Sequence, residues 1–278
     1  MLLLMDIGGT KTLVTVSNKG VTFSNPLQFS TPQNFSEALE LFKTIKQDVL
    51  ELRQVECVVV GIAGLLDPSK KQLDYAPHLP DWGKKPLTKE LKKIFHAPVY
   101  LENDAALGAL GEAHYGSGKN KKIVAYLTFS TGVGGARVVS GKLDTHRIGF
   151  EIGHHIINCE RLETFEDYAS GSSIGIKSGK KAEIIKNKKL WGSVAQFCAI
   201  GIYNAALFWS PDVIVLGGSM TKSLNLDRIR EYLKNINTVL PKFPPIKKAK
   251  FLDKSVLYGA LLFAHQQKLK NDTQKALQ

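Results

Sequence analysis

The stretch that decides the fold is Met5-Asp6-Ile7-Gly8-Gly9-Thr10-Lys11-Thr12, because a second form of it recurs later in the chain. Residues 2–21 have the pattern of an apolar strand, a glycine turn with hydroxyls and a second strand. Residues 123–142 repeat this pattern around the turn Ser130-Thr131-Gly132-Val133-Gly134-Gly135. One glycine turn is typical of an ordinary hairpin. Two matched turns, one in each half of the chain, predict two similar domains that face one ligand.

The composition of the two turns favours a phosphate as that ligand. Glycine lets backbone N–H groups approach a phosphate that a Cβ would hold off, and successive N–H groups in such a turn form an anion-binding concavity. Asp6 ends the first strand, where a carboxylate can hold Mg²⁺ beside a phosphate chain, often through water; alternatively it only begins the turn. The predicted phosphate ligands are Gly8, Gly9, Thr10, Lys11 and Thr12 in the first turn and Thr131, Gly132 and Gly134 in the second.

Length and composition fit a cytoplasmic protein of about two domains. The chain has 278 residues and 44% hydrophobic residues, enough for two cores. It has no run of about 18 apolar residues, so we expect no membrane partner, and residues 1–4 lack the features of a signal peptide. Cys57, Cys159 and Cys198 are far apart, as is usual in a reducing cytosol, and the first and last lie in apolar runs that predict core thiols.

The net charge of +12 does not by itself indicate a nucleic-acid partner. Nucleic-acid binding requires basic residues gathered on one face together with base-contacting motifs. Here the lysines are spread in short groups such as 119–122, 186–189 and 247–250. We therefore expect a solvated basic surface, with attraction of anionic substrates such as nucleotides as the next interpretation.

Alternating strand and helix signals predict an α/β fold. Asn34-Phe35-Ser36-Glu37 resembles a capping box at the start of a helix. We expect one domain at 1–115, joined by a C-terminal helix within 255–278, and a second at 116–254, with a hinge at 116–122. Strands are expected at 55–60, 98–101, 123–129, 136–139 and 212–216, and helices at 35–52, 105–114, 194–209 and 255–268, followed by a frayed tail at 269–278.

Further segments carry groups suited to binding or proton transfer. Asn103-Asp104 follows an apolar strand and opens a helix of small residues. Asp and Asn are preferred N-caps, yet a carboxylate there could accept the proton of a substrate hydroxyl, as phosphoryl transfer requires; the residues alone favour neither. Glu151 and His154 can hydrogen-bond vicinal sugar hydroxyls, although an isolated histidine is more often structural. Glu166 has by itself the pattern of an ordinary helical acid.

Taken together, these motifs resemble the ROK family (repressors, open reading frames and sugar kinases), within the actin-like/hexokinase ATPase superfamily. The likeness covers nearly the whole chain in order. His78 stands where the family commonly has Asn, and Asp81 where it has Gly; Ser130 and Ala136 also replace usual glycines. The matching segments are 6–12 and 130–136 for phosphate, 61–64 and 76–82 for the sugar-side loops, 101–106 for catalysis, 151–154 with Glu166 for sugar, and 211–218 for adenosine.

The resemblance implies two ribonuclease-H-like α/β domains of the actin-like ATPase type with a cleft between them. It implies ATP-dependent phosphorylation of a hexose of the glucose type, with Asp104 as catalytic base and Asp6 positioning Mg²⁺. The sugar ligands would be Asn103, Glu151, His154, Glu166, Gly64 and His78, and Gly217 and Gly218 would lie against adenosine.

One departure from the family concerns zinc. The family commonly carries a zinc ion held by the histidine of the Glu-x-Gly-His motif and three cysteines before the second sugar acid. Here Cys159 falls on one cysteine position, Ile157 and Thr164 occupy the others, and the loop after His154 is shorter. Two ligands of four cannot close a tetrahedral structural site, so we expect no structural zinc.

Alternative functions stay open at this stage. An N-acetylhexosamine kinase (for N-acetylmannosamine or N-acetylglucosamine), a fructokinase and a polyphosphate-using kinase are not separable by sequence, because pocket shape is not visible. A repressor would need a helix-turn-helix segment, and only five residues precede Asp6. A non-catalytic sugar-binding regulatory protein is disfavoured by the presence of both Asp6 and Asp104. The expected partners are sugar and ATP, with a homodimer left open.

Overall fold

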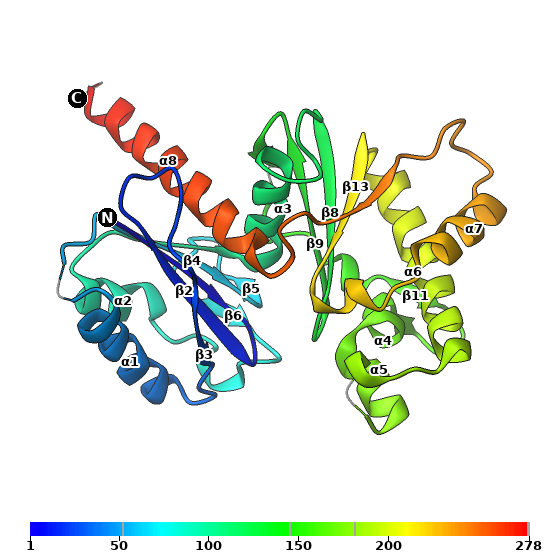
Figure 1. Cartoon of the computed structure of the whole chain (residues 1–278), viewed down its shortest axis with the longest axis horizontal. Coiled ribbons are helices and arrows are strands. Elements are labelled where there is room, and N and C mark those ends of the chain that lie inside the picture. Colours follow the sequence, from blue (N-terminus) through cyan, green and yellow to red (C-terminus); the bar gives the residue numbers. More distant parts are fainter. Residues whose placement is uncertain (52, 145, 181, 277–278) are drawn as a thin grey trace. The chain divides into compact units, whose positions relative to one another are not determined.

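The two glycine hairpins begin the sheets of two separate α/β units (Figure 1). The computed structural model describes residues 1–51, 53–144, 146–180 and 182–276. Unit 1 comprises Met1–Gly111, His146–Gly149 and Val256–Gln278, and unit 2 comprises Glu112–Thr145 and Phe150–Ser255. Unit 1 thus gives way to unit 2 inside a helix, after Gly111, whereas the sequence predicts a hinge at 116–122. The last two residues of the helix expected within 255–278 lie outside the described residues.

Unit 1 is built on a five-stranded sheet in the order β3-β2-β1-β4-β7. Its glycine turn joins β1 (Leu2–Ile7) to the antiparallel β2 (Lys11–Ser17). On its other side β1 runs parallel to β4 (Cys57–Ile62), which runs parallel to β7 (Val99–Asn103), while β3 (Leu27–Ser30) pairs with β2. Parallel strands covered on both faces need continuous apolar runs, and β1 and β4 have them.

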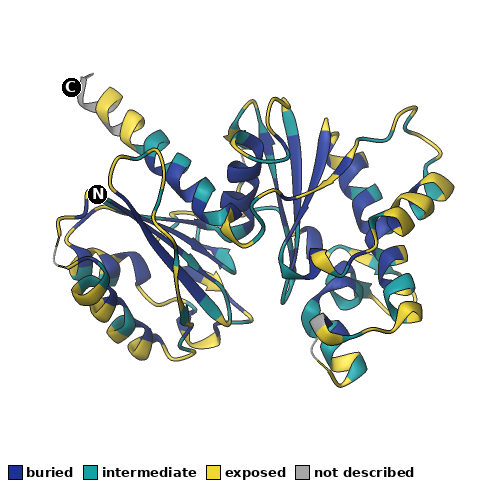
Figure 2. Cartoon of the chain, in the orientation of Figure 1, coloured by how far each residue is buried: buried dark blue, intermediate teal, exposed yellow. Residues whose placement is uncertain are grey.

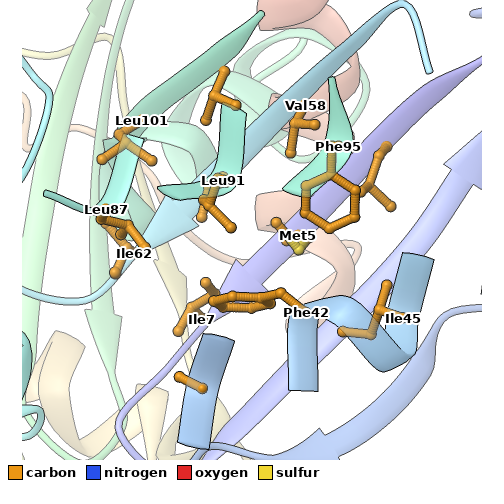
Figure 3. Packing of buried hydrophobic residues seen from close by; sticks show 14 of the residues in the cluster. Met5, Ile7, Phe42, Ile45, Val58, Ile62, Leu87, Leu91, Phe95 and Leu101 are labelled. Carbon is orange, nitrogen blue, oxygen red and sulfur yellow. The ribbon is translucent and has the colours of Figure 1, made fainter. Parts of the chain in front are cut away.

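Helices α1 (Phe35–Thr44) and α2 (Leu87–Phe95) cover one face of this sheet. Phe42 of α1 and Leu91 of α2 are buried in one cluster with Met5 of β1 (Figure 3). Helix α1 begins where the capping box predicts, since Asn34 Oδ1 accepts from Ser36 N at 2.8 Å. The chain continues as a π-helix at Ile45–Val49.

Helices α3 (Asp104–His114) and α8 (Ser255–Ala276) pack on the opposite face of this sheet. Their partners on β1 alternate with the β1 residues that are buried against α1 and α2. Leu4 is buried there with Leu107 and Leu257. The helices approach closely because residue 259 is glycine: a Cβ there would lie 1.8 Å from Leu107 O. The predicted frayed tail is wrong as far as the described residues go, because α8 continues to Ala276; its last turns contain lysine, glutamine and alanine, which favour helix.

Unit 2 repeats the arrangement with a sheet in the order β10-β9-β8-β13-β14. The second glycine turn joins β8 (Ile123–Phe129) to the antiparallel β9 (Val133–Val139), and β8 runs parallel to β13 (Val213–Gly217) as β1 does to β4. The edges are β10 (Lys142–Leu143) and β14 (Ile246–Lys248). The prediction of two similar α/β domains is confirmed. Figure 2 shows both sheets as mainly buried.

The remaining elements are short, apart from α6 and α7. Unit 1 also contains the two-stranded sheet β5 (Leu65–Leu66) and β6 (Leu73–Tyr75) and a 3-10 turn at Pro80–Trp82. Unit 2 contains β11 (Ile156–Asn158), β12 (Glu163–Thr164), α4 (Phe165–Ala169), α5 (Gly171–Ser178), α6 (Lys188–Trp209), α7 (Leu226–Ile236) and 3-10 turns at Ile152–His154, Ala182–Ile184, Ser219–Lys222 and Leu252–Lys254.

Helix α6 is the long apolar helix of unit 2. It begins at Lys188, before the predicted start at Val194, because Asn187 caps it and accepts from Lys189 N at 3.0 Å. Sequence alone predicts no membrane span, yet α6 meets the length and composition of one, with a mean hydropathy of 1.2 over its most apolar window. Core helices meet the same criterion, and 44% of that window is buried in this structure.

Glu112, near the end of α3, is a fully buried carboxylate within unit 2. Its Oε2 accepts from Ser117 N at 2.9 Å and Lys250 N at 3.0 Å, and its Oε1 accepts from Phe251 N and from Ser255 Oγ, both at 2.9 Å. These bonds satisfy a group whose burial would otherwise be costly. One side chain therefore joins the end of α3 to the start of α8, and nothing in the sequence pattern marks it.

Candidate functional site

The first group of candidate residues lies at the carboxyl ends of the parallel strands of unit 1. The register pairs Asp6 with Gly61 and pairs Ile62 with Asn103. These strand ends lead into the first glycine turn, the loop with Gly64 and the start of α3 at Asp104. In open α/β sheets, ligands bind outside the carboxyl ends of the strands. Unit 1 thus gathers its predicted metal, sugar and catalytic residues at one edge of its sheet.

The first glycine turn is tightened by contacts on both sides. Gly8 N donates to Lys11 O at 2.9 Å, and Gln33 Nε2 donates to Gly9 O at 2.7 Å. Thr10, at the tip, is exposed. Thr12 does not fit its predicted role as a phosphate ligand: it is 1% exposed, and its hydroxyl lies 2.9 Å from that of Thr31. Thr12 instead fastens β2 to β3.

His78 packs directly against the first glycine turn. A Cβ on Gly9 would lie 2.6 Å from the Cβ of His78, so glycine is required for this approach. The loop that carries His78 is anchored to the start of α1, because Phe35 N donates to Asp81 Oδ2 at 2.9 Å and Trp82 Nε1 donates to Pro32 O at 3.1 Å. The aspartate at a position where the family commonly has glycine therefore has a structural function here.

Asn103 and Asp104 make different hydrogen bonds at the start of α3. Asn103 Oδ1 accepts from Ala106 N at 3.1 Å, which is the N-cap bond of α3. Its amide Nδ2 donates to Gly64 O at 3.2 Å, which ties the loop after β4 to this helix. Asp104 is the first residue of the helix, and its Oδ1 accepts from Ala105 N at 2.8 Å. The carboxylate of Asp104 is therefore held in a fixed orientation at the helix start.

An ion pair between a buried glutamate and a partly exposed lysine lies beside this edge, and it was not found from the sequence. Glu102 is 2% exposed, and its Oε2 accepts from Lys70 Nζ at 2.5 Å. Its Oε1 accepts from Asn103 N at 3.1 Å. The pair fixes the backbone immediately before Asp104. Glu102 gave no signal in the sequence, because its partner comes from a separate loop.

The second glycine turn, in unit 2, is held by the elements that follow the hairpin. Gly171 N donates to Ser130 O at 2.7 Å, and Ser172 N donates to Thr131 O at 3.1 Å. Val133 N donates to Glu166 Oε2 at 2.6 Å. Glu166, predicted to bind sugar, thus also holds the backbone of a turn predicted to bind phosphate.

Glu151 and His154 are the exposed polar groups of the 3-10 turn at Ile152–His154. Their side chains are 45% and 52% exposed, and His154 Nδ1 lies 3.4 Å from Glu151 Oε2. The turn packs on the second hairpin, since a Cβ on Gly153 would lie 2.0 Å from Val133 O. Both side chains can therefore reach a ligand from a backbone fixed to the second glycine turn.

The hairpin after His154 is closed by a polar cluster of Asn158, Glu163 and Tyr168. Asn158 Nδ2 donates to Glu163 Oε2 at 3.1 Å and to the Tyr168 hydroxyl at 2.8 Å, and the Tyr168 hydroxyl also donates to Glu163 Oε2. The bond from the Tyr168 hydroxyl to Glu163 raises the pKa of Tyr168. The Tyr168 ring stacks on Phe197 of α6, with centroids 3.6 Å apart. The chain thus closes this hairpin with its own side chains.

The helix that carries Glu166 is capped by Thr164 and Asp167. Asp167 Oδ2 accepts from Thr164 N at 2.7 Å and from Thr164 Oγ1 at 2.8 Å. The backbone bond from Thr164 is the main reason why the pKa of Asp167 is lowered. Thr164, at one of the positions where zinc-bearing members have cysteine, therefore acts as a helix cap. Among the described residues, no three His, Cys, Asp or Glu side chains gather as a metal site.

The end of β13 offers a surface without side chains at Gly217 and Gly218. A Cβ on Gly217 would lie 2.1 Å from the Tyr126 hydroxyl, and one on Gly218, where φ is +84°, would lie 2.2 Å from Phe129 O. Only glycine fits at both positions, because β13 lies so close to β8. Such a flat edge at a strand's carboxyl end suits a planar ring.

Relatives of this chain include a glucokinase and an N-acetyl-D-glucosamine kinase. Thermotoga maritima glucokinase is 28% identical over 283 residues, which cover 86% of this chain and 88% of the relative. The N-acetyl-D-glucosamine kinase of Histophilus somni is 27% identical over 299 residues, covering 92% of this chain and 96% of the relative.

A ROK family glucokinase from Streptomyces griseus, solved in complex with glucose and AMPPNP, has the same fold. The TM-score is 0.81 at 24% identity, over 95% of this chain and 99% of that one. This likeness identifies the fold as that of the actin-like ATPases. The family model described as ROK family matches residues 3–267. Because that match runs from β1 into α8, this chain belongs to the ROK family.

Proposed function

We propose that this protein is an ATP-dependent sugar kinase that phosphorylates a hydroxyl of a glucose-type hexose. The observation that carries the proposal is the position of Asp104 at the start of α3, at the strand edge that also holds Asp6 and the first glycine turn. Phosphoryl transfer needs a group that accepts the hydroxyl proton, a metal that offsets phosphate charge and donors that hold the phosphates. Asp104 would accept the proton and the two glycine turns would hold the phosphates, while Asp6 would hold the metal.

In the proposed reaction, the sugar hydroxyl oxygen attacks the γ-phosphorus of ATP while Asp104 accepts the hydroxyl proton. The bond from the γ-phosphorus to the bridging oxygen breaks, and ADP leaves. Asp6 fits Mg²⁺, which binds proteins through one or two carboxylates together with substrate phosphates and would offset phosphate charge. Catalysis is then mainly positioning and charge stabilisation.

The phosphates would be held by the two glycine turns. Backbone N–H groups of Gly8, Gly9, Gly132 and Gly134 act with the side chains of Thr10, Lys11 and Thr131, and the edge at Gly217 and Gly218 receives adenosine. Thr12 is left out of this set, because its hydroxyl bonds to Thr31.

The sugar would be bound by Glu151, His154 and Glu166 from unit 2 and by Asn103 and His78, with the Gly64 loop, from unit 1. Asn103 has capacity for this role, because an amide has two donors and two acceptor lone pairs and its bonds to Gly64 O and from Ala106 N use one of each. Exposure of Glu151 and His154 supports the same role.

The choice of sugar is the finer part of the proposal. A glucose-type hexose is favoured because glucokinases recur among the relatives and among the solved structures of the same fold. Relatives named as a fructokinase and an N-acetyl-D-glucosamine kinase keep those sugars as alternatives, and an inorganic polyphosphate/ATP-glucomannokinase stands among the structural neighbours. A cytoplasmic location, with no nucleic-acid or membrane partner, is proposed with it.

A panel of sugars tests the proposal. The purified protein is incubated with ATP, Mg²⁺ and each of glucose, mannose, fructose, N-acetylglucosamine and N-acetylmannosamine, and ADP release is measured. A xylose repressor also stands among the relatives, so turnover itself is at issue. Sugar-dependent ADP release, fastest with glucose, is expected. No release above the ATP-only rate, with polyphosphate also inactive as donor, would refute a kinase.

A further inference from the structure

The second glycine turn and the helix that carries Glu166 form one hydrogen-bonded assembly within unit 2. The turn carbonyls of Ser130 and Thr131 accept from Gly171 N and Ser172 N, at the start of α5. The link from α4 is a side chain, because Val133 N donates to Glu166 Oε2 at 2.6 Å. The backbone of the turn is therefore held by two backbone bonds from α5 and by one side chain, that of Glu166.

Gly132 makes this contact possible. A Cβ at residue 132 would lie 2.6 Å from Glu166 Oε2, so any larger residue would force the carboxylate away from the turn. Val133 itself is 4% exposed, and its N–H is therefore poorly placed to meet a phosphate. The carboxylate can thus accept from this backbone donor without competing with a ligand for it.

The other carboxylate oxygen of Glu166 is differently placed. Among the described residues, Oε1 accepts no hydrogen bond, and the residue is half-buried. An ionised carboxylate has about four lone-pair sites, so a ligand hydroxyl can donate to Oε1 while Val133 N stays on Oε2. The same side chain can therefore serve a sugar and the turn at once.

We propose that Glu166 couples the two substrates: Oε1 binds a sugar hydroxyl while Oε2 fixes the second phosphate turn, so that sugar binding strengthens nucleotide binding. This inference rests on the proposed kinase function. A glutamate side chain loses rotamer freedom when it is fixed. The binding free energy of the first substrate is reduced by this entropic cost. The second substrate then binds to a turn that is already ordered, so it binds more tightly. This is positive coupling without a new contact between the ligands.

Coupling of this kind is reciprocal and measurable. Calorimetry gives the Kd of AMPPNP with Mg²⁺ in the absence of sugar and at saturating glucose, or the hexose that the panel selects. The wild-type protein is expected to bind the nucleotide about five-fold or more tightly with sugar, which is the low end of typical coupling.

Two substitutions at the same residue separate sugar binding from coupling. E166A removes the acceptor for Val133 N, so the ratio of the two Kd values should fall to about one, even with sugar raised to saturation. E166Q keeps a carbonyl oxygen for Val133 N but turns a donor toward the sugar, so sugar Kd should rise while most of the ratio persists. E151Q is the control: it should weaken sugar binding and leave the ratio unchanged, because the Glu151 side chain pairs with His154.

Hydrogen exchange at the Val133 amide verifies the link directly. Exchange should be faster in E166A than in the wild-type protein and near wild-type in E166Q. The inference is overturned if E166A keeps the wild-type ratio, if E166Q loses it as fully as E166A, or if E166A binds nucleotide more tightly without sugar. A wild-type ratio of one overturns it too. Absence of sugar-dependent ADP release would instead refute the kinase, and that assay is independent of these binding ratios.

Discussion

At the scale of the residue, the structure separates two neighbours that sequence cannot. Asn103 and Asp104 are both preferred N-caps, and either could have capped α3. The bond from Ala106 N goes to Asn103 Oδ1, so the capping role belongs to Asn103. Asp104 is then not needed to cap α3, and its carboxylate stands at the strand edge. The proposed base is therefore the neighbour of the N-cap residue, and its Oδ1 accepts from Ala105 N.

Replacement of Asp104 by asparagine tests this assignment. Asn keeps the shape of the side chain but cannot accept the hydroxyl proton, so kcat should fall about 10²–10⁴-fold, the usual contribution of a general base. Sugar affinity, measured by calorimetry, should change little. D227N, at an exposed carboxylate on α7, is the matched control and should keep wild-type turnover. A D104N protein with more than about a tenth of wild-type kcat lies outside that range and would show that another group takes the proton.

At the scale of the element, the hairpin of β11 and β12 depends on the Tyr168 hydroxyl, which bonds both Asn158 and Glu163. Y168F removes both bonds and keeps the stack on Phe197. We expect a loss of about 1–2 kcal/mol in unfolding free energy. We also expect the KM for sugar to rise relative to wild type by a larger factor than the KM for ATP. Y203F is the control, because the Tyr203 hydroxyl makes no hydrogen bond among the described residues. If Y168F and Y203F changed the unfolding free energy and the KM for sugar equally, the Asn158–Glu163–Tyr168 cluster would not be what holds the hairpin.

The cap of α4 predicts a dependence of stability on pH. Because the bond from Thr164 N lowers the pKa of Asp167 in the folded protein, the ionised carboxylate stabilises the fold above the unfolded pKa, which is about 3.9. This contribution is lost as pH falls through the lowered folded pKa. Melting curves of wild type and D167N should therefore differ at pH 7 and converge as pH falls below about 4. A difference that stays constant down to pH 2 would exclude ionisation of Asp167 as its source.

At the scale of the whole molecule, the repeated hairpin and the alternating signals were enough to predict two α/β units. The strand at Ile123–Phe129 was predicted to the residue, because its apolar run ends at the turn. Contacts between segments distant in sequence were not predictable: the anchoring of the His78 loop by Asp81, the Lys70–Glu102 pair and the four bonds to Glu112. Each depends on a partner that only the folded chain brings near.

We predict that the chain is stable without zinc, and chelation tests this prediction. In zinc-bearing members the metal ties down the segment that carries the sugar ligands. Here Ile157 and Thr164 supply no thiolate, and the segment is held by the Asn158–Glu163–Tyr168 cluster and by the Thr164–Asp167 cap. EDTA should therefore abolish turnover only by removing Mg²⁺, and excess Mg²⁺ alone should restore it.

The melting temperature supplies the second half of this test. Structural zinc contributes about 10 kcal/mol or more to the folding of small zinc domains, so its removal would lower the melting temperature visibly, whereas we expect almost no shift. Y168F should respond to EDTA as wild type does, because the cluster and not a metal holds the hairpin. Near-stoichiometric zinc in the purified, untagged protein, together with a fall in melting temperature on chelation, would show that a metal shares this task.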